Sequence, residues 1–259
     1  MAADLHSVLL ADEGPAARVV NPNGASPVVI VCEHASSRIP RALGNLGLDD
    51  AALMSHIAWD PGALGVSLAL GKALDAAVVT AAFSRLAYDC NRPPDAPAAM
   101  PARSEVYDIP GNLGLDDAQK QARVQGLYAP FHAAVGDALA ARGAGAVLVT
   151  IHSFTPVYFG QKRAVELGIL HDSDARLADA MLAQASAFTA MKTERNQPYG
   201  PDDGVTHTLQ RHGVSLGILN VMIEIRNDLL TGAKAQAKAA QDLAGLLKAA
   251  LASPRKAVA

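Results

Sequence analysis

Three groups of polar residues in this sequence stand at the ends of short apolar runs. Glu33 and His34 directly follow the first run. His152 follows the second, and Glu224 lies near the end of the third. Histidine and carboxylate side chains are ligands of catalytic zinc, which keeps one position open for water and lowers the pKa of that water to about 7. This set of residues indicates metal-dependent hydrolysis.

Each of these residues also has a plain structural explanation. A single histidine after a strand is more often a hydrogen-bonded part of the scaffold than a ligand. Glu33 and His34 are a stronger signal, because burying two adjacent polar groups would waste desolvation energy unless a charged species binds there. Glu224 could instead form a salt bridge with Arg226, although residues two apart in a strand point to the same face, which would leave both open to a crevice.

The elements that must position these residues are those of an α/β fold, because short apolar runs alternate with longer helical patterns. Strands are predicted over 27–32, 77–82, 84–88, 145–151, 164–170 and 215–225. Helices are predicted over 60–74, 116–141 and 174–187, in a segment that reaches residue 212, and from 227 or 228 to 251. Since the carboxyl ends of parallel strands open onto one crevice, the polar groups should converge there.

Asp60 is the residue with two competing interpretations. Asp60 followed by Pro61 is typical of a helix start, with the carboxylate as N-cap and the proline at the first helical position, where no hydrogen-bond donor is lost. His56 could share a metal with Asp60 only if the helix began before His56, which Pro61 disfavours. We therefore expect Asp60 to be a cap.

Two arginines are candidates for substrate binding. The guanidinium fork matches a carboxylate with two parallel hydrogen bonds, so a site for an acidic amino-acid derivative would use one or two arginines. Arg92 follows Asn91 in a proline-rich loop, and Arg163 follows the loop after His152. Rigid loops lower the cost of ordering a binding site, which favours both positions.

Composition narrows the class of protein. The 259 residues are 50% hydrophobic and 18% charged, which excludes disorder over most of the chain. A net charge of -3 and 4% aromatic residues argue against nucleic-acid binding and favour a small-molecule substrate. The two cysteines imply no disulfide framework, and neither a secretory signal nor a membrane span is recognisable, so a cytoplasmic location is expected.

Several common catalytic patterns are missing from the sequence. It contains no Walker phosphate loop, no strand followed by GxGxxG, and no GxSxG serine elbow. Nucleotide chemistry and serine nucleophiles are therefore disfavoured. We find no internal repeat, and we expect one domain over residues 1–259, with residues 1–24 as a peripheral N-terminal segment.

Six short segments, taken together, resemble the N-formylglutamate amidohydrolase family. They are VCEHASSRIP (31–40), WDPGA (59–63), SRLAYDCNRP (84–93), IPGN (109–112), IHSFTP (151–156) and IEIRND (223–228), and they occur in the order of the family. The resemblance implies a three-layer, phosphorylase/hydrolase-like fold with a mixed, mostly parallel sheet, similar to that of zinc carboxypeptidases. It also implies cleavage of N-formyl-L-glutamate to formate and L-glutamate, as in histidine catabolism.

The similarity to zinc carboxypeptidases implies roles for individual residues. His34 and His152 correspond to the histidine ligands of a divalent metal, most simply zinc. The first metal motif of those enzymes is His-x-x-Glu, but Ser37 stands three residues after His34, so Glu33 is the first candidate for the third ligand and Asp60 the second. Glu224 resembles the general base.

For the substrate carboxylate, the pair that resembles the carboxypeptidase Asn-Arg pair is Asn91-Arg92, with Arg163 as a second clamp. Two alternatives to the deformylase remain. One is a metallo-carboxypeptidase-like amidase acting on another N-acyl amino acid or peptide. The other is a non-catalytic domain that binds an amino acid. The oligomeric state is left open.

Overall fold

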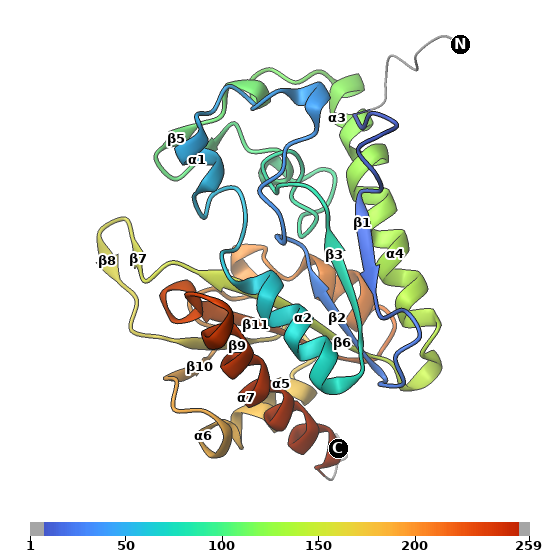
Figure 1. Cartoon of the computed structure of the whole chain (residues 1–259), viewed down its shortest axis with the longest axis vertical. Helices are drawn as coiled ribbons and strands as arrows, with labels where there is room; N and C mark the ends of the chain where they lie inside the picture. The colour runs from blue at the N-terminus through green and yellow to red at the C-terminus, as the bar shows by residue number, and fades with distance from the viewer. Residues whose placement is uncertain (1–7, 254–259) are drawn as a thin grey trace.

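The computed structural model describes residues 8–253, which form a mixed sheet of seven strands (Figure 1). Across the sheet the strands are β1 (Ala17–Val20), β3 (Ala77–Ala81), β2 (Val28–Cys32), β6 (Val147–Phe154), β11 (Leu219–Arg226), β9 (Leu167–Leu170) and β10 (Thr193–Arg195). Strands β3, β2, β6 and β11 are parallel, whereas β1 and β9 run antiparallel to β3 and β11. The predicted α/β fold with a mixed, mostly parallel sheet is confirmed.

Helices cover both faces of this sheet and give the molecule three layers. The helices α2 (Ala63–Leu74), α5 (Arg176–Leu182) and α7 (Ala233–Ala252) cover one face, and α4 (Ala129–Ala140) covers the other (Figure 1). In β2, Val28 and Ile30 pack on the side of α2 and α7, whereas Val29 and Val31 pack on the side of α4. Because side chains alternate along a strand, a strand covered on both faces must be apolar throughout.

The segments that leave the carboxyl ends of β2 and β3, residues 33–62 and 82–116, form a cap beside the sheet. They contain α1 (Asp50–Met54) and the hairpin of β4 (Arg103–Ser104) and β5 (Tyr107–Asp108). An apolar core of their own holds them together; it comprises Leu46, Ala52, Ile57, Ala58, Leu86 and Ile109. The cap therefore lies where the polar residues after β2 emerge.

The remaining elements are short. They are α3 (Asp117–Arg123), α6 (Ala185–Phe188), the hairpin of β7 (Val157–Tyr158) and β8 (Gln161–Lys162), the π-helical Val124–Tyr128 and Leu209–Val214, and the 3₁₀ turns Arg41–Leu43, Pro97–Ala99, Pro110–Asn112, Gly143–Gly145, Pro201–Asp203 and Asn227–Leu230. The predicted helix over 116–141 thus corresponds to α3, the first π-helical segment and α4. It starts at an Asp116 N-cap that forms a capping box with Gln119.

Two local predictions are wrong. Residues 84–88 form turns rather than a strand, because the Ser84 hydroxyl accepts the Leu86 amide and donates to the carbonyl of Ala58 in the cap. Asp60 is not a helix cap, because α2 begins at Ala63 with Gly62 as its N-cap and the Asp60 side chain points elsewhere.

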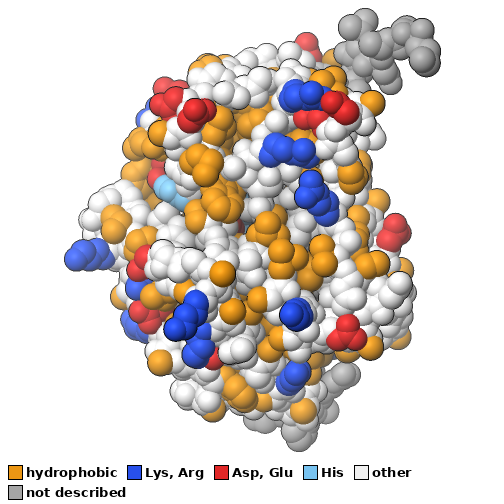
Figure 2. Space-filling model, viewed as in Figure 1, with side chains coloured by type: hydrophobic (Ala, Val, Ile, Leu, Met, Phe, Trp, Pro, Cys, Tyr) orange, Lys and Arg blue, Asp and Glu red, His pale blue; other side chains and the backbone are white. Residues whose placement is uncertain are grey.

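Surface properties add little to these conclusions. On the face seen in Figure 2, cationic, acidic and apolar side chains are interspersed. Within residues 8–253, no helix combines the length and apolar composition that crossing a bilayer would require.

Candidate active site

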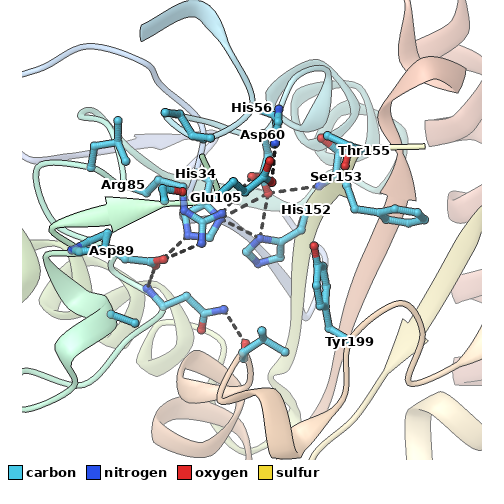
Figure 3. Close-up of a pocket in the computed structure, with 18 of the residues that line it drawn as sticks. His34, His56, Asp60, Arg85, Asp89, Glu105, His152, Ser153, Thr155 and Tyr199 are labelled. Atoms are coloured by element: carbon cyan, nitrogen blue, oxygen red, sulfur yellow. Dashed lines mark hydrogen bonds and ion pairs between the residues drawn. The ribbon is translucent and has the colours of Figure 1, made fainter. Parts of the chain in front are cut away.

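Three of the four polar residues at the ends of the apolar runs, all except Glu33, line one cavity at the carboxyl ends of the central strands. His34 lies two residues beyond β2, while His152 and Glu224 lie within β6 and β11. Parallel pairing places His152 directly beside Glu224, since the two are partners in the register of β6 and β11. All three side chains are buried and line a cavity of about 360 Å³ (Figure 3). The predicted convergence is therefore present.

Three ligand-type atoms converge at the inner end of this cavity. His34 Nδ1 and His152 Nδ1 lie 3.2 Å apart, and Asp60 Oδ2 lies 3.3 Å from the first and 3.1 Å from the second. The Ser153 amide donates to Asp60 Oδ2 at 3.1 Å, and the Asp60 amide donates to the His34 carbonyl at 2.9 Å. Backbone contacts to both histidine segments thus hold Asp60 in place.

A carboxylate also contacts the other nitrogen of each histidine. Asp89 Oδ1 lies 2.8 Å from His34 Nε2, and Glu33 Oε2 lies 3.2 Å from His152 Nε2. The hydrogen bond with Asp89 favours a proton on His34 Nε2 and leaves the His34 Nδ1 lone pair for the cluster, whereas Glu33 and His152 form an ion pair without a hydrogen bond. Glu33, the first sequence candidate for the third ligand, therefore lies behind His152, while Asp60 faces both Nδ1 atoms.

Arg85 joins the two aspartates. Its Nη2 lies 2.7 Å from Asp89 Oδ2, and its Nη1 lies 3.5 Å from Asp60 Oδ1. Reasoning from the sequence assigned no role to Arg85 or Asp89, although both stand in the segment 84–93 that carries the family resemblance. The strand expected over 84–88 gave no reason to place the Arg85 side chain at the site, and Asp89 stood between that strand and the proline-rich loop without a local signal of its own.

The electrostatics of the cluster follow from burial and mutual charge. Burial lowers the pKa of His152, but the carboxylates of Glu33 and Asp60 outweigh it and leave that pKa well above the ordinary value. Burial raises the pKa of Asp60, but the two histidines outweigh it and hold that pKa below the usual range. For Glu224 burial dominates and raises the pKa to about 7, against the attraction of His152. Glu224 can therefore exchange a proton near neutral pH.

The donor set fits a divalent metal ion. Two imidazole nitrogens and one carboxylate oxygen, all within 4.8 Å of one another on buried residues, correspond to the three protein ligands of a catalytic zinc site. His34 has the outer carboxylate hydrogen bond that is usual for metal-binding histidines, and the Glu33 carboxylate lies beside the outer nitrogen of His152. One oxygen of Glu224 is buried without a hydrogen-bond partner among the described residues, so the cavity also holds an uncommitted acceptor.

The residues predicted to bind substrate lie at different depths. The Asn91 side chain is held by two hydrogen bonds to the backbone. Its Nδ2 donates to the Val205 carbonyl, and its Oδ1 accepts a hydrogen bond from the Thr208 backbone amide. Arg92 lines the cavity and donates to the carbonyls of Asn91 and Gly204; within residues 8–253 it has no carboxylate partner. An arginine that lacks an internal anion can bind one from a ligand.

Arg163 lies one layer behind the cavity wall. Its guanidinium carbon lies 4.4 Å from the ring centre of Tyr158 and 4.9 Å from that of Tyr199, and its Nη2 donates to the Tyr199 hydroxyl at 2.9 Å. Both tyrosines line the cavity, whereas Arg163 does not. His56 also lines the cavity, but its Nε2 lies 2.7 Å from Glu105 Oε1, and it takes no part in the cluster around Asp60.

This chain is similar to a known protein family and to a solved structure. The family model described as N-formylglutamate amidohydrolase matches residues 26–231, which include every residue of the cluster. A crystal structure of the gene product Atu2144 from Agrobacterium tumefaciens is 53% identical, covers 94% of this chain and 98% of that chain, and superposes with a TM-score of 0.92. A search of curated proteins gives no match.

One more distant structure shares the fold. N-formylglutamate amidohydrolase from Ralstonia eutropha is 18% identical, with a TM-score of 0.63 over 90% of this chain and 96% of that chain. A metallo-carboxypeptidase from Burkholderia cenocepacia is 13% identical, with a TM-score of 0.38 over 90% of this chain and 64% of that chain. Because the family model covers well over half of the sequence, the chain belongs to the N-formylglutamate amidohydrolase family.

Proposed function

We propose that this amidohydrolase uses a divalent metal, most simply zinc, to cleave N-formyl-L-glutamate into formate and L-glutamate. The observation that carries the proposal is the convergence of His34 Nδ1, His152 Nδ1 and Asp60 Oδ2 beside Glu224 in one cavity. These three atoms are the ligands we assign, with Asp60 in the place for which Glu33 was the first candidate. The metal, when bound, would polarise the formyl carbonyl and acidify a water molecule.

Glu224 is the proposed general base. Its buried carboxyl has a pKa raised to about 7, so it is ionised in a large fraction of molecules at neutral pH and still binds a proton readily. It accepts a proton from the attacking water and returns it to the amide nitrogen as the C–N bond breaks. Water therefore supplies one oxygen of formate and the proton that the leaving amine takes up, while the formyl group supplies the other oxygen.

Arg92 is the proposed partner of the substrate α-carboxylate. It lines the cavity and has no carboxylate partner within residues 8–253, whereas Arg85 on the same cavity is already paired with Asp89 and Asp60. Asn91 fixes the backbone before Arg92 through its contacts with Val205 and Thr208. Substrate charge would thus be matched at one end of the cavity and the acyl group presented at the other.

Formate release from N-formyl-L-glutamate by the purified protein, with and without added zinc after chelation, tests the proposal. N-acetyl-L-glutamate and a dipeptide ending in glutamate serve as comparison substrates. We expect zinc-dependent turnover of the formyl compound and little of the others. Preference for the acetyl or peptidyl compound would identify an amidase with another acyl specificity. Binding of L-glutamate without turnover of any compound would identify a non-catalytic binding domain.

A further inference from the structure

Tyr199 lies at the edge of the catalytic cluster, on the loop between β10 and the second π-helical segment. It lines the same cavity as His152, Ser153 and Glu224 (Figure 3). The side chain is half-buried and belongs to the wall of the space that a substrate would occupy. The proposed mechanism has so far used neither its ring nor its hydroxyl.

The hydrogen bond from Arg163 fixes the direction in which the Tyr199 hydroxyl can act. A guanidinium group has donors and no acceptor, so the phenolic oxygen must accept the bond from Arg163 Nη2. The phenolic hydrogen remains available, since no described residue accepts a hydrogen bond from it. Burial and the nearby Glu224 raise the pKa of Tyr199, and Arg163 opposes them only in part. Because the net effect is a raised pKa, the hydroxyl stays protonated at neutral pH.

Three other neutral donors in the cavity lining already donate hydrogen bonds to backbone carbonyls. The Ser153 hydroxyl donates to the Pro61 carbonyl, and the Thr155 hydroxyl donates to the Val157 carbonyl. The Asn91 amide donates to the Val205 carbonyl. The hydroxyls of Tyr158 and Ser104 also line the cavity, but no hydrogen bond to a described residue holds either in place. Tyr199 thus has a hydroxyl that is both fixed in position and free to donate.

The acyl oxygen is the group that most requires such a donor. When water adds to the carbonyl, this oxygen gains negative charge; the carboxylates of Asp60 and Asp89 in the cavity cannot donate to it, and Glu224 takes up the proton of the water and returns it to the amide nitrogen. We propose that Tyr199 is a further catalytic residue, whose hydroxyl donates to the acyl oxygen as it becomes negative, and that Arg163 is a positioning residue acting through Tyr199. This inference rests on the proposed amidohydrolase function.

Steady-state kinetics of Tyr199→Phe with N-formyl-L-glutamate test the catalytic assignment. The variant keeps the ring against Arg163 and loses only the hydroxyl. We expect kcat to fall about 10²-fold, the size seen for loss of one oxyanion donor. KM should change by less than about twofold, because the interaction forms in the transition state. A raised KM with unchanged kcat would overturn the assignment and indicate a contact with the substrate carboxylate.

Tyr107→Phe is the matched control. Tyr107 is also half-buried, lies outside the cavity lining, and has a hydroxyl without a hydrogen bond to a described residue. It should retain wild-type kinetics, and zinc content should be equal in both variants and the wild type. Arg163→Met should lower kcat in the wild-type background, but the double variant should have nearly the same kcat as Tyr199→Phe alone. If the two residues acted independently, the two reductions in kcat would multiply. Full multiplication would overturn the positioning role of Arg163.

A binding experiment separates failure of this inference from failure of the proposed function. N-phosphono-L-glutamate, a tetrahedral phosphoramidate, mimics the adduct of water with the formyl group, and L-glutamate lacks the acyl group. Calorimetry should show weaker binding of the phosphoramidate to Tyr199→Phe and unchanged binding of L-glutamate. If this binding result were found but the wild type did not hydrolyse N-formyl-L-glutamate, the proposed deformylase function would be refuted and the donor role of Tyr199 would be supported. If the wild type and Tyr199→Phe bound the phosphoramidate equally well, or if the wild type did not bind it, the donor role of Tyr199 would be refuted.

Discussion

Replacing Asp60 by asparagine should remove one of three metal ligands while keeping the shape of the side chain. Asp60 Oδ2 faces both Nδ1 atoms, and the Ser153 amide holds that oxygen in place. The free energy of zinc binding at protein sites with four ligands is about 10–16 kcal/mol, so each ligand contributes roughly 3 kcal/mol. That loss corresponds to a zinc dissociation constant raised by about 10²-fold or more.

Glu33→Gln is the comparison that makes the Asp60 experiment informative. Glu33 lies 3.2 Å from the outer nitrogen of His152 and does not face the Nδ1 atoms, so its loss should weaken zinc binding by about 10- to 100-fold, as for other groups that orient a ligand. Zinc affinity is measured by competition with a chromophoric chelator, and circular dichroism of the metal-free proteins checks that both variants fold. If Glu33→Gln weakens zinc binding more than Asp60→Asn does, our ligand assignment is incorrect.

Three further predictions concern catalysis, substrate charge and pH. Glu224→Gln should retain zinc and lose about 10² to 10⁴ in kcat, and a loss below tenfold would make Glu224 a structural residue. Arg92→Lys should reduce kcat/KM for N-formyl-L-glutamate far more than for an N-formyl amino amide without the α-carboxylate, because ammonium cannot form the bidentate pair; equal losses would make Arg92 a scaffold residue. Burial lowers the pKa of His132 to about 3 and of His212 to about 4, so both stay neutral in the fold while the unfolded chain takes up protons below about pH 6.5. Each of the two histidines should therefore lower the free energy of unfolding by about 2 kcal/mol as the pH falls from 7 to 5. In urea titrations His212→Asn should lose less stability over this interval than the wild type, and an equal loss would contradict the prediction.

The sequence alone determined the fold class and the elements that supply the two histidines. Apolar runs such as residues 28–32 specify strands buried on both faces, because every position must be apolar when helices cover both sides. The polar residues that end these runs are local signals too, so His34, His152 and Glu224 could be placed at one edge of the sheet before the structure was known. The parallel pairing of β6 and β11 then set His152 beside Glu224.

Only the tertiary structure decided which carboxylate faces the histidine pair. By local sequence Asp60 is a helix cap and Glu33 is the neighbour of His34, yet Asp60 faces both Nδ1 atoms and Glu33 lies behind His152. Asp60 reaches the cluster through backbone contacts with residues 26 and 93 positions away in the chain. The direction of a side chain is set by such long-range contacts, and local propensity carries no information about them.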